Sequence, residues 1–502
     1  MGVVQKESIR NTIIYYSGVA LGYLNMVIIF PRVFQSDQYG LVRFIFPFAG
    51  IMAICYLIGI PSVIIRFFPH LKDKDKRHNG LLFFSLSVMA VGILLFTTVF
   101  FIFKPYILDV YSKNAGLFVR YYYVVIPLAI GFAIFEVLSA YNRSLLKTNF
   151  AVFLMEVYAR IAALLIAIGY KEHFFNFTTF INLYVTAYFS TAVIMIFYTY
   201  FNKELYLKPS KTMFKPNFLK QIMNYGLFSF FGGISGTLVD KIDVLFVGGY
   251  LGLAETGIYG VAILMASSIA LPAKALYQVL SPLTANAFKE NDREKLKYLY
   301  SSSCSNQLFI GAVFFMLIWI NFDPFFTLVH PAFLAAKTAF LILSVWRLFD
   351  MATGINGVLI VNSKYYRYDL FFTVMLVVLI TICNQLLIPR FGMIGAASAT
   401  TGAIVVYNVI KYFFVWAKLK LQPFNLETVK ILLTILSIFF ISGFLPGSGY
   451  VIFDMFYKTL VIGLLFLFSL VYLKINPEIF QLVLTGYKKG RKMLPFRRSD
   501  VE

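Results

Sequence analysis

Three charged residues, Asp240, Lys241 and Asp243, lie near the middle of an apolar stretch that runs from Gly226 to Tyr250. The stretch is long enough to cross a bilayer, where ionised side chains are costly and usually functional. On a helix, the two aspartates share a face, while Lys241 is turned by roughly 100° from Asp240. Two carboxyl groups on one desolvated face predict a site that exchanges H⁺ or binds a cation such as Na⁺. The alternative is an internal ion pair that holds this helix to a neighbour.

Cationic side chains also fall inside other predicted spans. The full set is Arg160, Lys241, Lys274, Arg347 and Lys411. Arg160 follows Glu156 by four residues and Arg347 precedes Asp350 by three, so each cation has a partner on its own helix face. These two pairs are candidates for structural ion pairs.

Two of these cations, Lys274 and Lys411, have no local partner in the sequence. Lys274 follows Pro272 and is expected nearer the middle of the membrane. Lys411 either lies on a substrate path or extends to the inner surface. Glu136, near the inner end of its span, is a candidate partner for one of the cations.

The composition predicts an all-α polytopic membrane protein. Of 502 residues, 60% are hydrophobic and 13% are charged, whereas soluble domains carry about a quarter charged residues. Windows of about 20 apolar residues give about fourteen transmembrane helices. The predicted spans are 11–31, 43–65, 81–103, 119–140, 151–169, 180–201, 226–250, 257–281, 298–321, 336–361, 370–389, 394–416, 429–446 and 456–474.

Basic residues are concentrated in alternate loops. With a cytoplasmic N-terminus, most of the 44 Lys and Arg fall in inner segments, which places both termini in the cytoplasm. The net charge of +21 then lies beside anionic membrane lipids. Nucleic-acid binding, which needs a basic face on a soluble surface, is not expected.

No pattern predicts a metal centre or a cofactor. Cys55, Cys304 and Cys383 lie in spans, too far apart for a metal motif, and we interpret them as reduced packing residues. The four histidines fall in loops without the spacing of metal ligands.

The order of spans, turns and loops in the first half of the chain recurs in the second half. Four pairs of landmarks lie 217 to 220 residues apart: Asp37 and Glu255, Lys72 and Lys289, Pro105 and Pro324, and Asn142 and Asn362. The offset predicts two parallel six-helix repeats, 1–216 and 217–425. Two further spans follow in 426–475, and 476–502 forms a basic cytoplasmic tail. This tail has one apolar face, formed by Ile479, Phe480, Val483 and Leu484. The face predicts a segment that lies on the inner leaflet, and the alternative is a disordered basic tail.

Several short motifs fit this twelve-plus-two layout. They are SIRNTIIYYSG, DQYGLVRF, RFFPHLKDKDKR, AYNRSLLKTN and RFGMIGAASATTGA. With the duplication, they resemble the Wzx-type flippases that export polysaccharide units in bacteria, in the superfamily that also holds MATE exporters and MurJ-type lipid II flippases. The resemblance implies two six-helix lobes around a cavity that opens alternately to either side of the bacterial cytoplasmic membrane.

The resemblance also implies a substrate. This is undecaprenyl-pyrophosphate-linked oligosaccharide, moved outward for surface polysaccharides such as the lipopolysaccharide O-antigen and delivered to polysaccharide polymerase machinery. Phosphates need a hydrated, positively lined path, so Lys274 and Arg347, and with them Lys241 and Arg160, become candidate phosphate contacts. Asp240 and Asp243 are then the candidate ion-coupling groups.

Two other functions remain open. One is a MATE-like exporter of small molecules, driven by a cation gradient. The other, from a different class, is a membrane polysaccharide polymerase or glycosyltransferase, which needs a sizeable outer loop with catalytic acids or arginines. The longest outer segments, 104–118 and 322–335, offer only Asp109 and Asp323 as acids, so we do not expect an enzyme.

Overall fold

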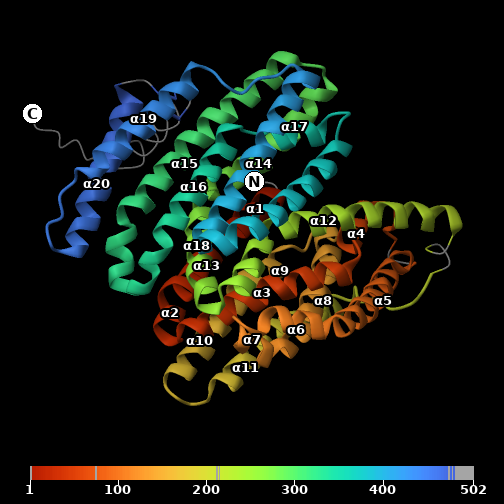
Figure 1. Cartoon of the computed structure of the whole chain (residues 1–502). Helices are drawn as coiled ribbons and strands as arrows, with labels where there is room; N and C mark the ends of the chain where they lie inside the picture. The colour runs from red at the N-terminus through yellow and green to blue at the C-terminus, as the bar shows by residue number, and fades with distance from the viewer. Residues whose placement is uncertain are drawn as a thin grey trace, which may run out of the picture. The chain divides into compact units, whose positions relative to one another are not determined.

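The computed structural model describes residues 3–73, 76–210, 213, 215–472, 475–476 and 479–480 (Figure 1). Side chains are described for these residues except 3–9, 12, 274, 275 and 278. Val483, Leu484 and the basic run of the tail lie outside the described residues.

The first part of the chain, up to the stretch that holds Asp240 and Asp243, is helical over its described length apart from short turns and the stretch 202–210. Its helices are α1 (Val3–Tyr23), η1 (Leu24–Ile29), α2 (Phe30–Val33), α3 (Ser36–Leu57), α4 (Ile60–Leu71), η2 (Arg77–Gly80), α5 (Leu81–Ile102), α6 (Lys104–Ser112), α7 (Gly116–Tyr121), η3 (Tyr122–Val124), α8 (Val125–Ser144), α9 (Asn149–Phe153), η4 (Leu154–Tyr158), α10 (Ala159–Lys171), α11 (Phe177–Phe201) and α12 (Pro216–Tyr250).

The second part continues in the same way. Its helices are α13 (Leu253–Ile269), α14 (Leu271–Lys289), α15 (Arg293–Val329), η5 (Pro331–Ala336), α16 (Lys337–Ala352), α17 (Asn356–Asn362), α18 (Arg367–Leu419), α19 (Leu426–Gly443) and α20 (Val451–Val471). Within the described residues, 11 helical stretches are long and apolar enough to cross a membrane, and α4 and α13 are shorter apolar helices. Every predicted span coincides with one or two helical stretches of the structure, although α12, which holds the span 226–250 with its three central charges, is not among the 11. The all-α polytopic membrane fold is confirmed.

Helix breaks occur where glycine and proline predict them. Between α3 and α4, Ile58 and Gly59 have φ angles of 44° and 76°, a conformation that glycine adopts at little cost. Pro272 lies in the first turn of α14, where its missing N–H is tolerated. Within α18, Gly392 has φ 57° and ψ −136°, and so separates the two predicted spans of this segment. In addition, α13 begins 217 residues after α3, which agrees with the repeat offset.

The helices form two compact units. Unit 1 comprises Met1–Val261 and Thr373–Ala399, and unit 2 comprises Ala262–Phe372 and Thr400–Glu502. In unit 1, α8 packs on α3, α4 and α11, and α12 packs on α3. In unit 2, α15 packs on α14, α16, α19 and α20 (Figure 1). These units are defined by contacts, and the domain boundaries drawn from the repeat stay a prediction.

Close helix crossings in unit 1 depend on glycine. At Gly40 in α3, a Cβ atom would collide with the backbone carbonyl of Leu253 at the start of α13. A backbone carbonyl cannot move aside as a flexible side chain can. A small residue is therefore required at this crossing, as is common between membrane helices.

Candidate functional site

One of the buried carboxyl groups of unit 1 belongs to Asp243. Its side chain is 4% exposed and lies on α12. The Tyr259 hydroxyl, from α13, donates a hydrogen bond to Oδ2 at 2.9 Å, and the backbone N–H of Val244 donates to Oδ1 at 2.9 Å. Both donors are neutral, so the carboxyl group is hydrogen-bonded without drawing on a cation for these two contacts.

Asp240 does not share this environment. It is exposed, whereas Asp243 is buried, so the expectation that both carboxyl groups lie on one desolvated face is wrong. Three residues on a helix differ by about 60° in direction, and this angle is enough to separate a packed position from an open one. The proposed sharing of an ion between the two aspartates stays a prediction.

Lys241 lies on the same helix and points toward α3. Its Nζ occupies the space that a side chain at Gly50 would fill. Gly50 therefore makes room for the ammonium group inside unit 1. Its contact with a substrate phosphate stays a prediction.

Arg160 and Glu156 form the ion pair that their spacing predicts. Arg160 Nη2 lies 2.7 Å from Glu156 Oε2, and Nη1 donates to the carbonyl oxygen of Gly18 on α1. A Cβ atom at Gly18 would collide with Glu156, and one at Gly22 would meet the Arg160 guanidinium. The two glycines, spaced as GxxxG, thus let α1 approach the ion pair closely.

A π-helical turn places this pair. Glu156 lies in η4, and Arg160 is the second residue after the end of η4. A second π-helical turn, η1, contains Asn25, whose Nδ2 donates to the backbone carbonyl of Arg160 at 2.7 Å. Single π-helical turns often occur at functional sites.

In unit 2, Lys411 is buried and paired. Its side chain is 5% exposed, and Nζ donates to Asp369 Oδ1 at 3.0 Å and to the Tyr407 hydroxyl at 2.9 Å. Lys411 thus has no acidic partner nearby in the sequence, as expected, but it is paired inside unit 2 with a residue far away in the sequence. Asp369 lies 42 residues earlier in the chain, and no helix-face rule relates positions on opposite sides of the break at Gly392.

This pair borders a cavity of about 390 Å³ in unit 2. The lining is mostly polar and consists of Tyr277, Ser281, Asp350, Asn356, Gly357, Val358, Val361, Asp369, Tyr407, Asn408 and Lys411. Asn408 Nδ2 donates to Asp350 Oδ1 at 3.1 Å, and Asn356 donates to Asn408 Oδ1 at 3.4 Å. The cavity therefore presents two carboxyl groups and one ammonium group in two hydrogen-bonded sets, which together form the polar network around Lys411.

Sequence reasoning missed the neutral members of this network. Tyr407 and Asn408 precede Lys411 by four and three residues, so all three lie on one face of the second half of α18. This polar face within an otherwise apolar span is the signal that could have identified them.

Arg347 on α16 is oriented by two neighbours. Nη2 donates to Ser267 Oγ at 3.1 Å, and the guanidinium carbon lies 3.6 Å from the centre of the Trp346 ring. Asp350, its expected partner, accepts its hydrogen bond from Asn408 instead of from a group on its own helix. Arg347 is thus held in a fixed orientation by an aromatic ring and a hydroxyl.

The remaining candidates are placed less fully. Lys274 lies in α14, and its side chain is outside the described residues. Glu136 lies 4.0 Å from Arg143, with both side chains about half exposed, and Arg143 is not one of the five cations predicted in spans. Among the described residues, no three His, Cys, Asp or Glu side chains come together as a metal site.

Comparison with known proteins gives a family and two relatives. A family described as polysaccharide biosynthesis protein matches residues 4–287. An uncharacterized membrane protein of Methanocaldococcus jannaschii is 25% identical over 456 residues, which cover 84% of this chain and 85% of the relative. A probable low-salt glycan biosynthesis flippase of Haloferax volcanii is 25% identical over 206 residues, 40% of this chain and 44% of the relative.

Solved structures share the fold. The inward closed conformation of the lipid II flippase MurJ has a TM-score of 0.66 at 13% identity and covers 93% of this chain and 99% of that chain. An inward-facing multidrug resistance MATE family transporter of the MOP superfamily has a TM-score of 0.60 at 16% identity. The match covers 81% of this chain and 94% of that chain. At such low sequence identities, these structures are evidence for the fold alone. Together with the family match, they confirm the superfamily resemblance seen in the sequence.

Proposed function

The chain belongs to the polysaccharide biosynthesis protein family, and from this premise we propose that it is a flippase for a lipid-linked oligosaccharide. The observation that carries the proposal is the family match over residues 4–287, within a chain whose fold is that of a flippase and transporter superfamily. The protein would move its substrate from the inner to the outer leaflet by alternating access. No covalent step is part of this proposal.

The chemistry of the substrate follows from the need to move a polar glycan across a lipid bilayer. A glycan that is too polar to enter lipid must be carried on a polyprenyl anchor through a phosphate or pyrophosphate. In a bacterium this carrier would be undecaprenyl pyrophosphate. The protein would lie in the cytoplasmic membrane with both of its termini in the cytoplasm. The two curated relatives are archaeal, so we define the substrate by its anchor, its phosphates and its neutral sugars.

Arg347 is the preferred phosphate contact. A guanidinium group presents a rigid fork that matches two phosphate oxygens, and Trp346 and Ser267 fix the plane of this fork. Lys274 is the second contact proposed in unit 2. In unit 1 we propose Lys241 and Arg160, the latter partly neutralised by Glu156 at 2.7 Å.

Asp243 is the proposed coupling group, with Asp240 beside it on the same helix. A buried carboxyl group whose hydrogen bonds come from a hydroxyl and a backbone N–H can change its charge while keeping those two partners. Uptake or release of H⁺ or Na⁺ there would then favour one conformation over another.

The test is to delete the gene and to determine on which leaflet the lipid-linked oligosaccharide resides. We expect accumulation on the cytoplasmic leaflet, reversed when the gene is restored. Normal outward delivery without polymer would instead assign the protein to polymerisation. Drug sensitivity with normal surface polysaccharide would assign it to small-molecule export.

A reconstituted assay gives the direct measurement. The full-length protein is placed in vesicles that contain lipid-linked oligosaccharide on one leaflet only, and transfer to the other leaflet is followed with an enzyme that trims exposed sugars. Vesicles without protein provide the background. Transfer at the background rate would overturn the proposed function.

A further inference from the structure

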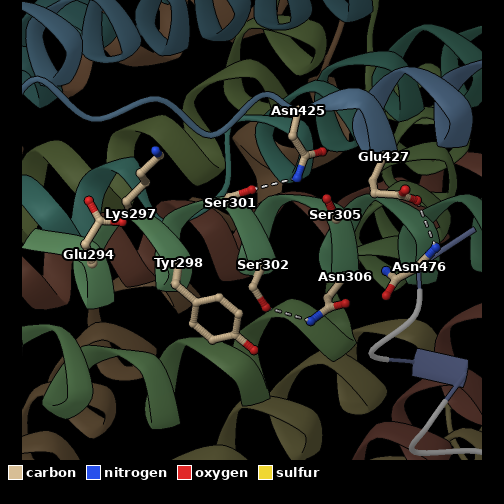
Figure 2. Close-up of a pocket in the computed structure, with 10 residues that line it drawn as sticks. All are labelled: Glu294, Lys297, Tyr298, Ser301, Ser302, Ser305, Asn306, Asn425, Glu427 and Asn476. Atoms are coloured by element: carbon tan, nitrogen blue, oxygen red, sulfur yellow. Dashed lines mark hydrogen bonds between the residues drawn. The ribbon is translucent and has the colours of Figure 1, made fainter.

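A second polar cavity lies in unit 2, apart from the network around Lys411. Its volume is about 340 Å³, at the lower end of the range of ligand pockets. One wall is the first part of α15, which contributes Ser301, Ser302, Ser305 and Asn306. The other side is formed by the start of α19 and by the residue Asn476, which follows α20 (Figure 2).

Hydroxyl and amide groups dominate this cavity. Asn425 Nδ2 donates to Ser301 Oγ at 2.7 Å, and Asn306 Nδ2 donates to Ser302 Oγ at 3.2 Å. Each of these groups can both donate and accept hydrogen bonds. A sugar hydroxyl group has the same double capacity, so the lining is complementary to a polyhydroxylated ligand.

Among the described lining residues whose side chains are buried, two polar side-chain atoms have no hydrogen-bond partner. They are Ser305 Oγ and Asn476 Nδ2, in side chains of residues that are 6% and 2% exposed. Unsatisfied buried polar atoms are rare because they lose their bonds to water without replacement. Figure 2 shows the Ser305 hydroxyl on the side of the cavity where Asn425 and Glu427 lie. A ligand that brings hydroxyl groups to these atoms would satisfy them.

The charges of the lining disfavour a phosphate. Glu294 and Glu427 contribute two carboxylates, and Lys297 contributes one ammonium group. Glu427 also forms an ion pair with Lys430 Nζ at 2.9 Å and accepts a hydrogen bond from the backbone N–H of Asn476 at 3.3 Å. These two contacts hold the Glu427 carboxylate in place. Because Lys297 and Lys430 balance the two carboxylates, the lining has no net positive charge to attract a phosphate, whereas its carboxylates can accept hydrogen bonds from sugar hydroxyls.

An aromatic ring lies at one end of the cavity. Tyr298 is 60% exposed, and Figure 2 places it beside Glu294 and Lys297, away from Asn476. An exposed ring offers a flat apolar face to the carbon side of a sugar. The cavity therefore combines a hydrogen-bonding wall with a surface on which a sugar ring can stack.

We propose that this cavity binds a neutral, hydroxyl-rich sugar of the lipid-linked oligosaccharide at the cytoplasmic end of unit 2. The inference rests on the proposed function and adds a sugar contact separate from the phosphate contacts. The start of α15, the start of α19 and the end of α20 all fall on the inner side if the basic loops are cytoplasmic. The cavity would then receive sugars before transport.

The test is equilibrium binding to the full-length protein in lipid nanodiscs. The probe is the oligosaccharide released by mild acid from the lipid-linked pool of cells that lack the gene, labelled with a neutral fluorophore. We expect saturable binding that weakens about tenfold in Ser305→Leu, because the leucine fills the cavity and removes the hydroxyl. Inorganic pyrophosphate should not compete.

A matched control lies on the same helix. Ser303 donates its hydroxyl to the carbonyl of Tyr300 at 2.8 Å and does not line the cavity, so Ser303→Ala should change affinity by less than about twofold. Tyr298→Ala removes an exposed ring without emptying a core, and should weaken binding several-fold even if Ser305→Leu fails to fold. Thermal unfolding of each variant identifies such a failure.

The outcomes separate the sources of the sugar and the two proposals. Equal binding of the released and the intact lipid-linked oligosaccharide, both weakened by Ser305→Leu, supports recognition of the sugar itself. The cavity proposal is overturned by the absence of saturable binding, by binding that Ser305→Leu and Tyr298→Ala leave unchanged, or by competition from pyrophosphate. Transfer between leaflets without such binding would leave the proposed function intact, whereas binding without transfer would retain the cavity and overturn the function.

Discussion

The buried carboxyl group of Asp243 in unit 1 and the buried ammonium group of Lys411 in unit 2 are held in different ways. Asp243 receives hydrogen bonds at 2.9 Å from the Tyr259 hydroxyl and the Val244 N–H. Lys411 instead donates at 3.0 Å to a carboxylate, Asp369, and at 2.9 Å to the Tyr407 hydroxyl. These two hydrogen bonds to Asp243 therefore come from neutral donors, whereas Lys411 is paired with a group of opposite charge.

This difference suggests different uses of the two clusters. If Asp369 lost its charge, the buried ammonium of Lys411 would be left uncompensated, which is costly. If Asp243 changed its charge, its two neutral neighbours could remain in place. We therefore infer that the cluster around Lys411 maintains the packing of unit 2, while the Asp243 cluster is suited to respond to an ion.

The largest loss of stability is expected for Asp369→Asn. Breaking a buried ion pair from one side costs roughly 3–5 kcal/mol, and the 33% exposure of the Asp369 side chain reduces this to about 2–3 kcal/mol. The measurement is the free energy of unfolding of the purified protein in mixed micelles.

The double variant Asp369→Asn with Lys411→Met is the control. Removing both charges leaves no uncompensated ion, so the double variant should be more stable than Asp369→Asn alone. Equal stability of the single variant and the unchanged protein would show that the pair does not hold unit 2 together.

The next effect tests whether an ion pair in unit 1 also has a structural role. In Gly18→Ala, the new Cβ would lie 2.5 Å from Glu156 Cβ and 2.8 Å from its backbone oxygen, which should cost about 1–3 kcal/mol. In the matched Gly22→Ala, the Cβ meets the tip of Arg160 at 2.6 Å, and a flexible tip can move. The free energy of unfolding should therefore be lower for Gly18→Ala than for Gly22→Ala. The reverse order would contradict this packing.

The sequence predicts local features of the fold and of the site. Spans follow from runs of apolar residues, and the breaks at Gly59, Pro272 and Gly392 follow from the backbone preferences of glycine and proline. The ion pair of Glu156 and Arg160 was predictable for the same reason, because four residues on one helix fix the distance.

Contacts between helices were not predictable in this way. Tyr259 lies 16 residues after Asp243, and Asp369 lies 42 residues before Lys411, so only the packing of separate helices makes them neighbours. The exposure of Asp240 likewise depends on where α12 meets α3 and not on the composition of α12. Periodicity gives the face of a helix, but it does not give the neighbour of that face.

Removal of a phosphate contact should affect stability less than it affects transport. Arg347→Ala loses at least the hydrogen bond to Ser267 and the contact with Trp346, which together cost about 1–2 kcal/mol. Transfer of the lipid-linked oligosaccharide between leaflets should nevertheless fall to background, and Lys274→Ala should also abolish export while the protein stays abundant.

Arg347→Lys is the control for these variants. It retains the charge but not the planar fork, so it should transport at an intermediate rate. Normal export by well-expressed Arg347→Ala or Lys274→Ala protein would remove that residue from the proposed phosphate path.

The smallest effect on stability is expected for Asp243→Asn, and it is the sharpest test of the comparison between the two units. Asparagine has nearly the same shape, and its oxygen can accept the hydrogen bond from Tyr259 while its NH2 group faces the N–H of Val244, so the loss should be about 1 kcal/mol. Transport in vesicles, scaled to folded protein, should nevertheless lose its dependence on the H⁺ or Na⁺ gradient, because ion binding could no longer favour one conformation. Asp240→Asn distinguishes a shared site from a single one: if both aspartates bind the ion, it should have the same effect, and if Asp243 acts alone, gradient dependence should persist. Full gradient dependence in both variants, or a loss of stability in Asp243→Asn as large as that in Asp369→Asn, would assign Asp243 to the structural role that we infer for the cluster around Lys411.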